Sequence, residues 1–257
     1  EPRGYPGLCA NILLPPTTRE ADAGFVIMEQ MEYPAMSGSN TICVTTVLLE
    51  TGILPMREPV TELTLEAPAG LIRVRADCRD GKVTSVTFRN VPAFAVHLDA
   101  PLEVPNVGTL TVDVAFGGMF YVIVDAARVG LRITPDEGAD IVRLGEIVKA
   151  AAREQLPAVH PDNPAIAGVT VTEFSAPATL PGAAMKNTVV ISTGVFDWEK
   201  PATWTGVLDR SACGTGTCAK MAALHAKGQL PLDTDFVHES IIGTTFTGRL
   251  IEEARVG

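Results

Sequence analysis

The 257-residue sequence lacks long hydrophobic runs, an excess of basic residues and any regular spacing of cysteine or histidine. No apolar run approaches the roughly 18 residues of a membrane span, and no charged-then-apolar signal opens the chain. A formal charge of −10 disfavours nucleic acid and anionic membranes, because both bind basic faces. We therefore expect a cytoplasmic protein that has neither nucleic acid nor membrane as a partner.

The five cysteines and four histidines form no disulfide or metal pattern. The cysteine count is odd, there is no CxxC pair, and the histidines form no HxxxH or HxH pair. The sequence therefore predicts neither a metal site nor a disulfide framework. Cys43 and Cys218 fall within predicted helices and are most simply buried small hydrophobes. The 46% hydrophobic content suffices for one large or two medium domains.

One pattern occurs twice in the chain: residues 37–55 align on residues 213–231 without a gap. Each copy begins with small polar residues and glycine, continues through helix-compatible sequence, and stops at a glycine followed by Leu-Pro, which is typical helix-ending chemistry. Because residues 42–49 are apolar or small on nearly every side, we expect the first of these helices to be buried. The identical or similar pairs are Gly38 with Gly214, Ser39 with Thr215, Thr41 with Thr217, Leu48 with Leu224, Gly52 with Gly228, Leu54 with Leu230 and Pro55 with Pro231.

Each predicted helix start offers a site for an anion. The free N–H groups of a first helical turn attract a carboxylate or phosphate, and glycines let the ligand approach the backbone. At such a terminus the thiolate of Cys213 is stabilised, so its pKa should fall toward neutrality, where it can remove a proton. Ser37 holds the same place in the first copy, but its hydroxyl needs a neighbouring base. The two copies are alike in geometry and unequal in chemistry.

The motifs Met36-Ser-Gly-Ser-Asn40 and Asp209-Arg-Ser-Ala-Cys-Gly-Thr-Gly-Thr217 resemble those of the proline racemase superfamily, and Phe116-Gly-Gly-Met-Phe-Tyr121 and Ala222-Ala-Leu-His-Ala-Lys-Gly228 support the likeness over most of the chain. The superfamily includes proline racemases, 4-hydroxyproline 2-epimerases and trans-3-hydroxy-L-proline dehydratases. The resemblance implies two pseudo-symmetric halves of the proline racemase and diaminopimelate epimerase type. Each half is a curved, mostly antiparallel sheet around a buried helix, and the active site lies between the halves.

The resemblance also implies roles for single residues. It makes Ser37 and Cys213 the acid/base pair, one on each face of the substrate Cα. It implies a cofactor-independent enzyme for a small imino acid, working as a homodimer. Where Ser37, Ser39 and Ala212 stand, the racemases have cysteine, histidine and commonly proline, and the first two departures argue against plain racemisation. The implied substrate-binding groups are the N–H groups of Gly38, Ser39, Gly214 and Thr215 for the carboxylate, and Asp209 for the ring amine.

Irregularly alternating strands and helices with mostly hairpin connections indicate an α+β (mixed α/β) class. The Pro-rich and polar residues 99–106 predict the connection between a half of residues 1–104, which carries Ser37, and a half of 105–257, which carries Cys213. Comparing the two copies predicts that the first half lacks residues at its start. We expect strands over 8–14, 24–29, 61–66, 71–76, 83–89, 108–115, 120–124, 169–174 and 188–192, a hairpin over 239–252, and an amphipathic helix from Pro135 to about Gln155.

Several alternatives stay open in the sequence. Gly117 and Gly118 mark either an ordinary hairpin or a turn near the substrate. The loop 194–208, with two tryptophans, either covers the site or packs on its own half. Residues 214–220 fit neither GxxxxGK[ST] nor GxGxxG, so a nucleotide site is disfavoured. A covalent role for Cys213 requires a histidine, and His225 lies about 18 Å along the helix at 1.5 Å per residue.

The inequality of the two copies decides the expected reaction. A two-base epimerase must remove and deliver a proton on each face of Cα, whereas dehydration of trans-3-hydroxy-L-proline is possible from one face, because the α-hydrogen and the 3-hydroxyl share it. The leading hypothesis is therefore a trans-3-hydroxy-L-proline dehydratase in which Cys213 moves the proton. The alternatives are a 4-hydroxyproline 2-epimerase, a bifunctional enzyme, and a non-catalytic imino-acid binder.

Overall fold

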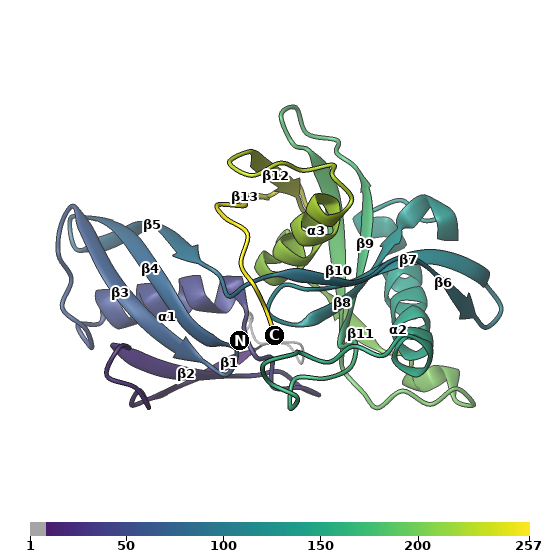
Figure 1. The fold of residues 1–257 in the computed structure, drawn as a ribbon, viewed down its shortest axis with the longest axis horizontal. Coiled ribbons are helices and arrows are strands. Elements are labelled where there is room, and N and C mark those ends of the chain that lie inside the picture. Colours follow the sequence, from purple (N-terminus) through teal and green to yellow (C-terminus); the bar gives the residue numbers. More distant parts are fainter. Residues whose placement is uncertain (1–8) are drawn as a thin grey trace. The chain divides into compact units, whose positions relative to one another are not determined.

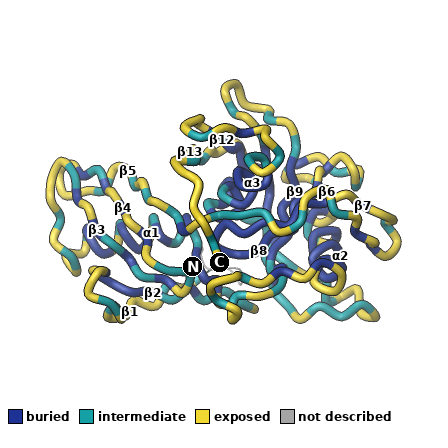
Figure 2. Tube along the Cα trace, in the orientation of Figure 1, coloured by how far each residue is buried: buried dark blue, intermediate teal, exposed yellow. Residues whose placement is uncertain are grey.

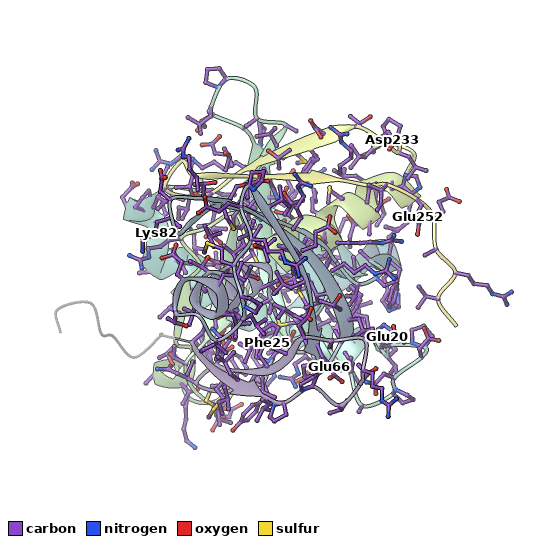
Figure 3. All side chains as sticks on the ribbon, turned by 90° about the vertical axis from the view of Figure 1, so that its left-hand side faces the viewer. Glu20, Phe25, Glu66, Lys82, Asp233 and Glu252 are labelled. Carbon is purple, nitrogen blue, oxygen red and sulfur yellow. The ribbon has the colours of Figure 1, made fainter. Side chains whose placement is uncertain are left out.

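The computed structural model describes residues 9–257, and within them residues 9–91 and Pro92–Gly257 form two compact units (Figure 1). The strand predicted over 8–14 runs from Ala10 to Leu14, and Leu8 lies outside the described residues. Within the described residues, no helix is long and apolar enough to span a membrane. The labelled charged side chains Lys82, Asp233 and Glu252 point outward (Figure 3).

The first unit is a five-stranded sheet with one helix. Its strands follow the order β1-β2-β3-β4-β5; β2 and β3 run parallel because α1 connects them, and the other neighbours are antiparallel. The predicted hairpin-linked strands between residues 61 and 89 are confirmed. The elements are β1 (Ala10–Leu14), β2 (Ala23–Met28), α1 (Gly38–Glu50), β3 (Val60–Ala67), β4 (Gly70–Arg79) and β5 (Lys82–Arg89).

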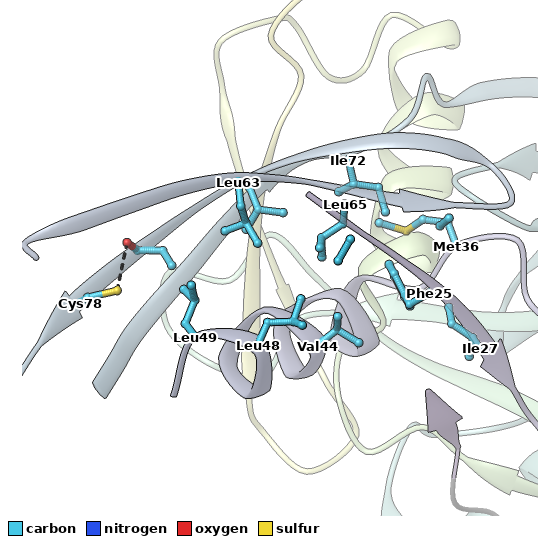
Figure 4. Close-up of a cluster of buried hydrophobic side chains, with 14 residues drawn as sticks. Phe25, Ile27, Met36, Val44, Leu48, Leu49, Leu63, Leu65, Ile72 and Cys78 are labelled. Atoms are coloured by element: carbon cyan, nitrogen blue, oxygen red, sulfur yellow. Dashed lines mark hydrogen bonds between the residues drawn. The ribbon is translucent and has the colours of Figure 1, made fainter. Parts of the chain in front are cut away.

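The core of this unit lies between α1 and one face of the sheet (Figure 4). Val44 and Leu48 of α1 pack with strand residues such as Leu65, since alternate strand residues point to the same face. The opposite side of the helix is open: Cys43 is exposed and Val47 is 48% exposed. The prediction of a helix buried on every side, with Cys43 inside, is therefore wrong; α1 covers the sheet with one face only.

The second unit is a larger sheet in the order β13-β12-β10-β9-β8-β7-β6, with β11 paired to β10. Two of its pairings are parallel, β8 with β9 and β10 with β12, and each is connected through a helix. The elements are β6 (Phe94–Val104), β7 (Gly108–Phe116), β8 (Phe120–Asp125), η1 (Ala126–Val129), η2 (Pro135–Glu137), α2 (Gly138–Gln155), β9 (Val171–Pro177), β10 (Met185–Ser192), η3 (Pro201–Thr203), β11 (Gly206–Leu208), α3 (Gly214–Ala226), β12 (Asp235–Glu239) and β13 (Thr245–Arg249).

Helices α2 and α3 cover opposite faces of this sheet. The hydroxyl of Thr172 donates to the Gly145 carbonyl of α2 at 2.7 Å, whereas the adjacent Val171 packs with Cys213 and Ala219 at α3. Successive strand residues point to opposite faces, so the two helices cannot share one. Figure 2 shows the resulting burial of the central strands between the helices. The predicted amphipathic helix packed on the sheet is confirmed as α2.

The division between the units differs from the sequence expectation. Residues 92–104 belong with the second unit, because β6 pairs with β7 along its length. The Pro-rich stretch expected to link the halves forms the end of β6 and a tight turn in which Asn106 has φ +62° and Val107 N–H donates to the Val104 carbonyl. Pro101 is accommodated because β6 is an edge strand.

The duplication seen in the sequence is present in the fold. β2-α1-β3 and β10-α3-β12 are both crossovers between parallel strands, and both helices have 13 residues. Each helix stops at the predicted glycine, Gly52 with φ +74° and Gly228 with φ +70°, a conformation that favours glycine. The predicted mixed α+β class is thus confirmed.

Candidate active site

Cys213 is the N-cap of α3 and has an unusual backbone, with φ +52° and ψ +110°. A non-glycine residue in this region costs free energy and persists only where its surroundings hold it. Three hydrogen bonds do so here. Asn187 Nδ2 and Thr217 Oγ1 donate to the Ala212 carbonyl at 3.0 and 2.9 Å, and Cys213 N–H donates to Ser211 Oγ at 3.0 Å. The sulfur is therefore held in a fixed position at the helix start.

Several polar groups lie in hydrogen-bond contact with the Cys213 sulfur. Gly216 N–H donates to it at 3.4 Å, the Tyr121 hydroxyl lies at 3.3 Å and the Thr215 hydroxyl at 3.8 Å. The hydroxyls of Tyr121 and Thr215 are 2.7 Å apart. None of these neighbours is a histidine, and His225 instead contacts the Leu230 carbonyl at the far end of α3. The arrangement does not supply the base that a covalent mechanism requires.

The environment of the Cys213 sulfur disfavours its thiolate. Burial raises the pKa of Cys213, and so does the negative charge of Asp209; hydrogen bonds from Tyr121 and from the N–H of Gly216 act in the opposite direction. The side chain is only 8% exposed, so desolvation outweighs the helix terminus. The prediction that the pKa of Cys213 falls toward neutrality is therefore wrong.

Asp209 lies just before the cysteine and is half-buried. Its Oδ1 accepts the Ser211 N–H at 2.8 Å. Burial raises the pKa of Asp209, while hydrogen bonds from Ser211 and from the Cys213 side chain lower it. A half-buried carboxylate beside a buried thiol favours a cationic ligand that neutralises the acid.

The Phe116–Met119 turn packs directly on the first turn of α3. A Cβ on Gly117 would lie 2.1 Å from the Thr215 carbonyl oxygen and 2.5 Å from the Ala219 nitrogen. Only glycine allows this approach of two backbones. The turn connects the antiparallel strands β7 and β8 as an ordinary hairpin does. Its contact with α3 also holds the helix that carries Cys213.

A buried polar cluster lies under the start of α3, and sequence reasoning missed it. Asn187 Nδ2 donates to Glu173 Oε1 at 3.3 Å, and His238 Nε2 is 4.0 Å from the same oxygen. Burial raises the pKa of Glu173 to about 8, against the opposing charge of Lys220, and burial also lowers the pKa of Lys220. Burial and Lys220 lower the pKa of His238 to about 3, so it is neutral. The sequence signal for this cluster is Glu173, a single acid within the strand predicted over 169–174.

The α1 start carries Ser37 as its N-cap, with an ordinary extended backbone at φ −144° and ψ +128°. Its Oγ accepts from Asn40 Nδ2 at 2.9 Å and from the Asn40 N–H at 3.5 Å, and Asn40 Oδ1 accepts from Asn11 at 2.8 Å. The Ser37 hydroxyl thus lies beside two side-chain amides that are hydrogen-bonded to each other. Within its own unit, Ser37 has no carboxylate, imidazole or amine in hydrogen-bond contact among the described residues.

Both helix starts present unused backbone donors. Among residues 9–257 the N–H groups of Gly38 and Ser39, and those of Gly214 and Thr215, have no hydrogen-bond partner. The first N–H groups of a helix lack intrahelical acceptors, and the helix dipole adds positive potential there. Each start therefore suits a carboxylate.

The predicted site residues thus form two half-sites. Asp209, Cys213, Gly214 and Thr215 lie together at the start of α3, and the remaining three, Ser37, Gly38 and Ser39, lie together at the start of α1, in the other unit. The loop 194–208 packs on its own unit, because the indole of Trp198 donates to Glu154 of α2 at 2.7 Å.

Comparison with known proteins places these half-sites in context. A family model described as proline racemase matches residues 1–257. A probable proline racemase from Agrobacterium radiobacter, solved with bound carbonate, superposes with a TM-score of 0.90 at 40% identity, covering 100% of this chain and 71% of that chain. A hydroxyproline epimerase from Agrobacterium vitis, solved with bound trans-4-hydroxy-L-proline, gives the same values. A phenazine biosynthesis protein of the PhzF family from Bacillus anthracis shares the fold alone, with a TM-score of 0.53 at 13% identity over 90% of this chain and 71% of that chain.

Proposed function

This chain belongs to the proline racemase family, and from that premise we propose that it dehydrates trans-3-hydroxy-L-proline to Δ1-pyrroline-2-carboxylate without a cofactor. The observation that carries the proposal is the inequality of the half-sites: Cys213 brings a sulfur, whereas the Ser37 hydroxyl borders the amide of Asn40 and not a base. Chemistry from one face of Cα suits this inequality best.

In this proposal the substrate is held by its two charges. Its carboxylate binds the unused N–H groups at the helix starts, those of Gly214 and Thr215 with those of Gly38 and Ser39. Its ring ammonium binds Asp209. The carbonate and the trans-4-hydroxy-L-proline bound in the two Agrobacterium proteins support a site for such anions and imino acids.

Substrate binding would also activate the sulfur. The charge of Asp209 is one of the causes that raise the pKa of Cys213 in the free protein. A ring ammonium paired with Asp209 neutralises that charge, so the thiolate forms more readily once the substrate is present. The acid/base group is then switched on by the molecule on which it acts.

The reaction needs one proton carrier. The Cys213 thiolate removes the α-proton and becomes a thiol, and the electron pair left on Cα expels the 3-hydroxyl from C3. Because the α-hydrogen and the hydroxyl lie on the same face, the thiol returns its proton to the departing hydroxide, which leaves as water. The enamine that remains tautomerises to Δ1-pyrroline-2-carboxylate. Ser37 serves as a hydrogen-bonding group on the opposite face.

A second candidate function is 4-hydroxyproline 2-epimerisation, alone or beside dehydration. The observation that favours it is the 40% identity to a hydroxyproline epimerase that holds trans-4-hydroxy-L-proline. In this case Ser37 must itself deliver or remove a proton at Cα, which requires a base, and among the described residues of its unit none lies in hydrogen-bond contact with Ser37.

Incubation with each hydroxyproline in D2O separates the candidates. Dehydration predicts loss of water from the trans-3-hydroxy isomer and little deuterium in recovered substrate. Epimerisation predicts an inverted, α-deuterated product from the trans-4-hydroxy isomer. Saturable binding of both without turnover would leave only a non-catalytic imino-acid binder. The homodimer and the cytoplasmic location stay predictions, and sedimentation of the full chain tests the first.

A further inference from the structure

The hydroxyl of Tyr121 lies between two other reactive groups and has no part in the mechanism above. It is 3.3 Å from the Cys213 sulfur and 2.7 Å from the Thr215 hydroxyl, and Tyr121 itself is 0% exposed. Strand β8 brings it there from 92 residues earlier in the chain. Three groups that each carry one movable hydrogen thus form a short buried chain.

The direction of hydrogen bonding in this chain follows from the charge on sulfur. A thiolate has no hydrogen and only accepts, and the Tyr121 hydroxyl at 3.3 Å is nearer to it than the Thr215 hydroxyl at 3.8 Å, so the hydrogen of Tyr121 points to the sulfur. The Tyr121 oxygen is left as an acceptor, and at 2.7 Å the hydroxyl of Thr215 is the group that donates to it. When the sulfur is a thiol, it can instead donate its hydrogen to the Tyr121 oxygen, and Tyr121 can donate to Thr215.

We propose that Tyr121 is a catalytic residue that donates a hydrogen bond to the Cys213 thiolate, and that Thr215 fixes this direction by donating to the tyrosine oxygen. The proposal rests on the proton-moving role proposed for Cys213. Tyr121 neither gains nor loses a proton: the α-proton passes from carbon to sulfur and then to the departing hydroxide, while the tyrosine hydroxyl only turns.

The charges around the sulfur show why such a donor is needed. Burial raises the pKa of Cys213 most, followed by the charge of Asp209 in the preceding loop and, last, that of Glu173 in β9. Hydrogen bonds from Tyr121 and from the N–H of Gly216 oppose them. Burial, followed by the charge of Cys213, raises the pKa of Tyr121, so the phenol keeps its hydrogen and remains a donor.

The test is Tyr121→Phe, which removes one oxygen and keeps the ring, with Tyr33→Phe as the control because Tyr33 is 67% exposed. The readout is the rate of Cys213 alkylation by iodoacetamide against pH, assigned to the residue by mass spectrometry so that the other cysteines do not interfere. We expect the pKa of Cys213 to rise by about one unit. At every pH below the wild-type pKa, alkylation should then slow about tenfold. The acid limb of kcat/KM should move by the same amount.

Thr215 provides a second, independent comparison. Thr215→Ser keeps the hydroxyl and should retain the wild-type alkylation rate, whereas Thr215→Val should slow it in the direction of Tyr121→Phe. This pair decides the matter if circular dichroism shows that Tyr121→Phe does not fold. Equal alkylation profiles for the wild type and Tyr121→Phe, or for Thr215→Ser and Thr215→Val, would overturn the proposal.

Alkylation needs no substrate, so the two proposals fail separately. A shifted Cys213 profile in an enzyme that consumes no hydroxyproline would support thiolate stabilisation by Tyr121 and remove the proposed reaction. Dehydration that proceeds while Tyr121→Phe has an unchanged alkylation profile would support the proposed reaction and overturn the role of Tyr121.

Discussion

The starts of α1 and α3 share a helical backbone that leaves N–H groups unpaired, but they differ at the N-cap residue. Both helices have 13 residues, stop at a left-handed glycine and leave their first two N–H groups without partners among the described residues. Ser37, however, has an ordinary extended backbone, whereas Cys213 is held at φ +52°. The comparison teaches that duplication has kept the anion-binding backbone, and that the reacting side chain differs between the copies.

The buried residues that support the two helices differ as well. Helix α1 packs on apolar strand residues and carries the buried hydroxyls of Thr41 and Thr45 itself. Helix α3 carries the buried Lys220, and the buried Glu173 of β9 and His238 of β12 lie near it. Among the described residues, the start of α3 is therefore the one with buried ionisable groups in its support.

The largest expected effect comes from abolishing the difference between the copies. Cys213→Ser places a hydroxyl at both helix starts and removes the thiolate, so turnover of either hydroxyproline should fall about a thousandfold. Cys43→Ser, on the exposed side of α1, is the matched control and should be active. Steady-state assays on both isomers measure the effect. Unchanged turnover in Cys213→Ser would remove this residue from the mechanism.

A smaller effect is expected at the weaker half-site. Ser37→Ala should lower any 4-hydroxyproline epimerisation about a hundredfold while leaving dehydration largely alive, since only epimerisation needs a group on the second face. Loss of the N-cap should cost about 1 kcal/mol of unfolding free energy. Ser37→Cys should instead raise epimerisation. The control is Thr51→Ala, whose hydroxyl bonds to Val47 at the other end of α1. Equal loss of both activities in Ser37→Ala would contradict a one-sided reaction.

The smallest expected effect concerns stability against pH. Glu173 has a folded pKa of about 8, above its usual 4.5, so its stabilising contribution is full below pH 4.5 and is lost as pH rises through 8. His238 has a folded pKa of about 3, below its usual 6.5, so its contribution is full above pH 6.5 and is lost as pH falls through 3. The second unit should therefore lose stability on both sides of a maximum near pH 5 to 6.

Glu173→Gln tests the alkaline side of that profile. The variant should gain stability relative to the wild type as pH rises from 5 to 8, by an amount on the order of a few kcal/mol. Both tryptophans, Trp198 and Trp204, lie in the second unit, so unfolding followed by their fluorescence reports on that unit. The exposed Glu199→Gln is the control. A difference between Glu173→Gln and wild type that does not change with pH would contradict the assignment.

Much of the fold was readable from the sequence because local signals agreed. The repeated glycine and Leu-Pro stops predicted both crossover helices, and the alternation between residues 61 and 89 predicted three paired strands. The boundary was harder, because Pro101 and Asn106 are linker-like in sequence but belong to an edge strand and its turn. Composition cannot distinguish a linker from a hairpin turn when pairing partners are unknown.

The supporting residues of the site were the part that the sequence concealed. Cys213 stood out through the repeat, whereas Tyr121 and Glu173 reach it from strands far away in the chain, and only the tertiary fold brings them near. The pKa of Cys213 was misjudged for the same reason. A helix terminus is visible in a sequence, but the burial and the carboxyl groups that oppose it are not.

The contact between the backbones of Gly117 and Thr215 bears on how this enzyme can be redesigned. A side chain at position 117 would collide with main-chain atoms, which have nowhere to move, and a side chain at Gly216 would press on the Glu173 carboxyl and on Cys213. Libraries aimed at new substrates should therefore keep these two positions constant and vary other residues. The close packing that holds the start of α3 in place thus also limits which substitutions this part of the protein accepts.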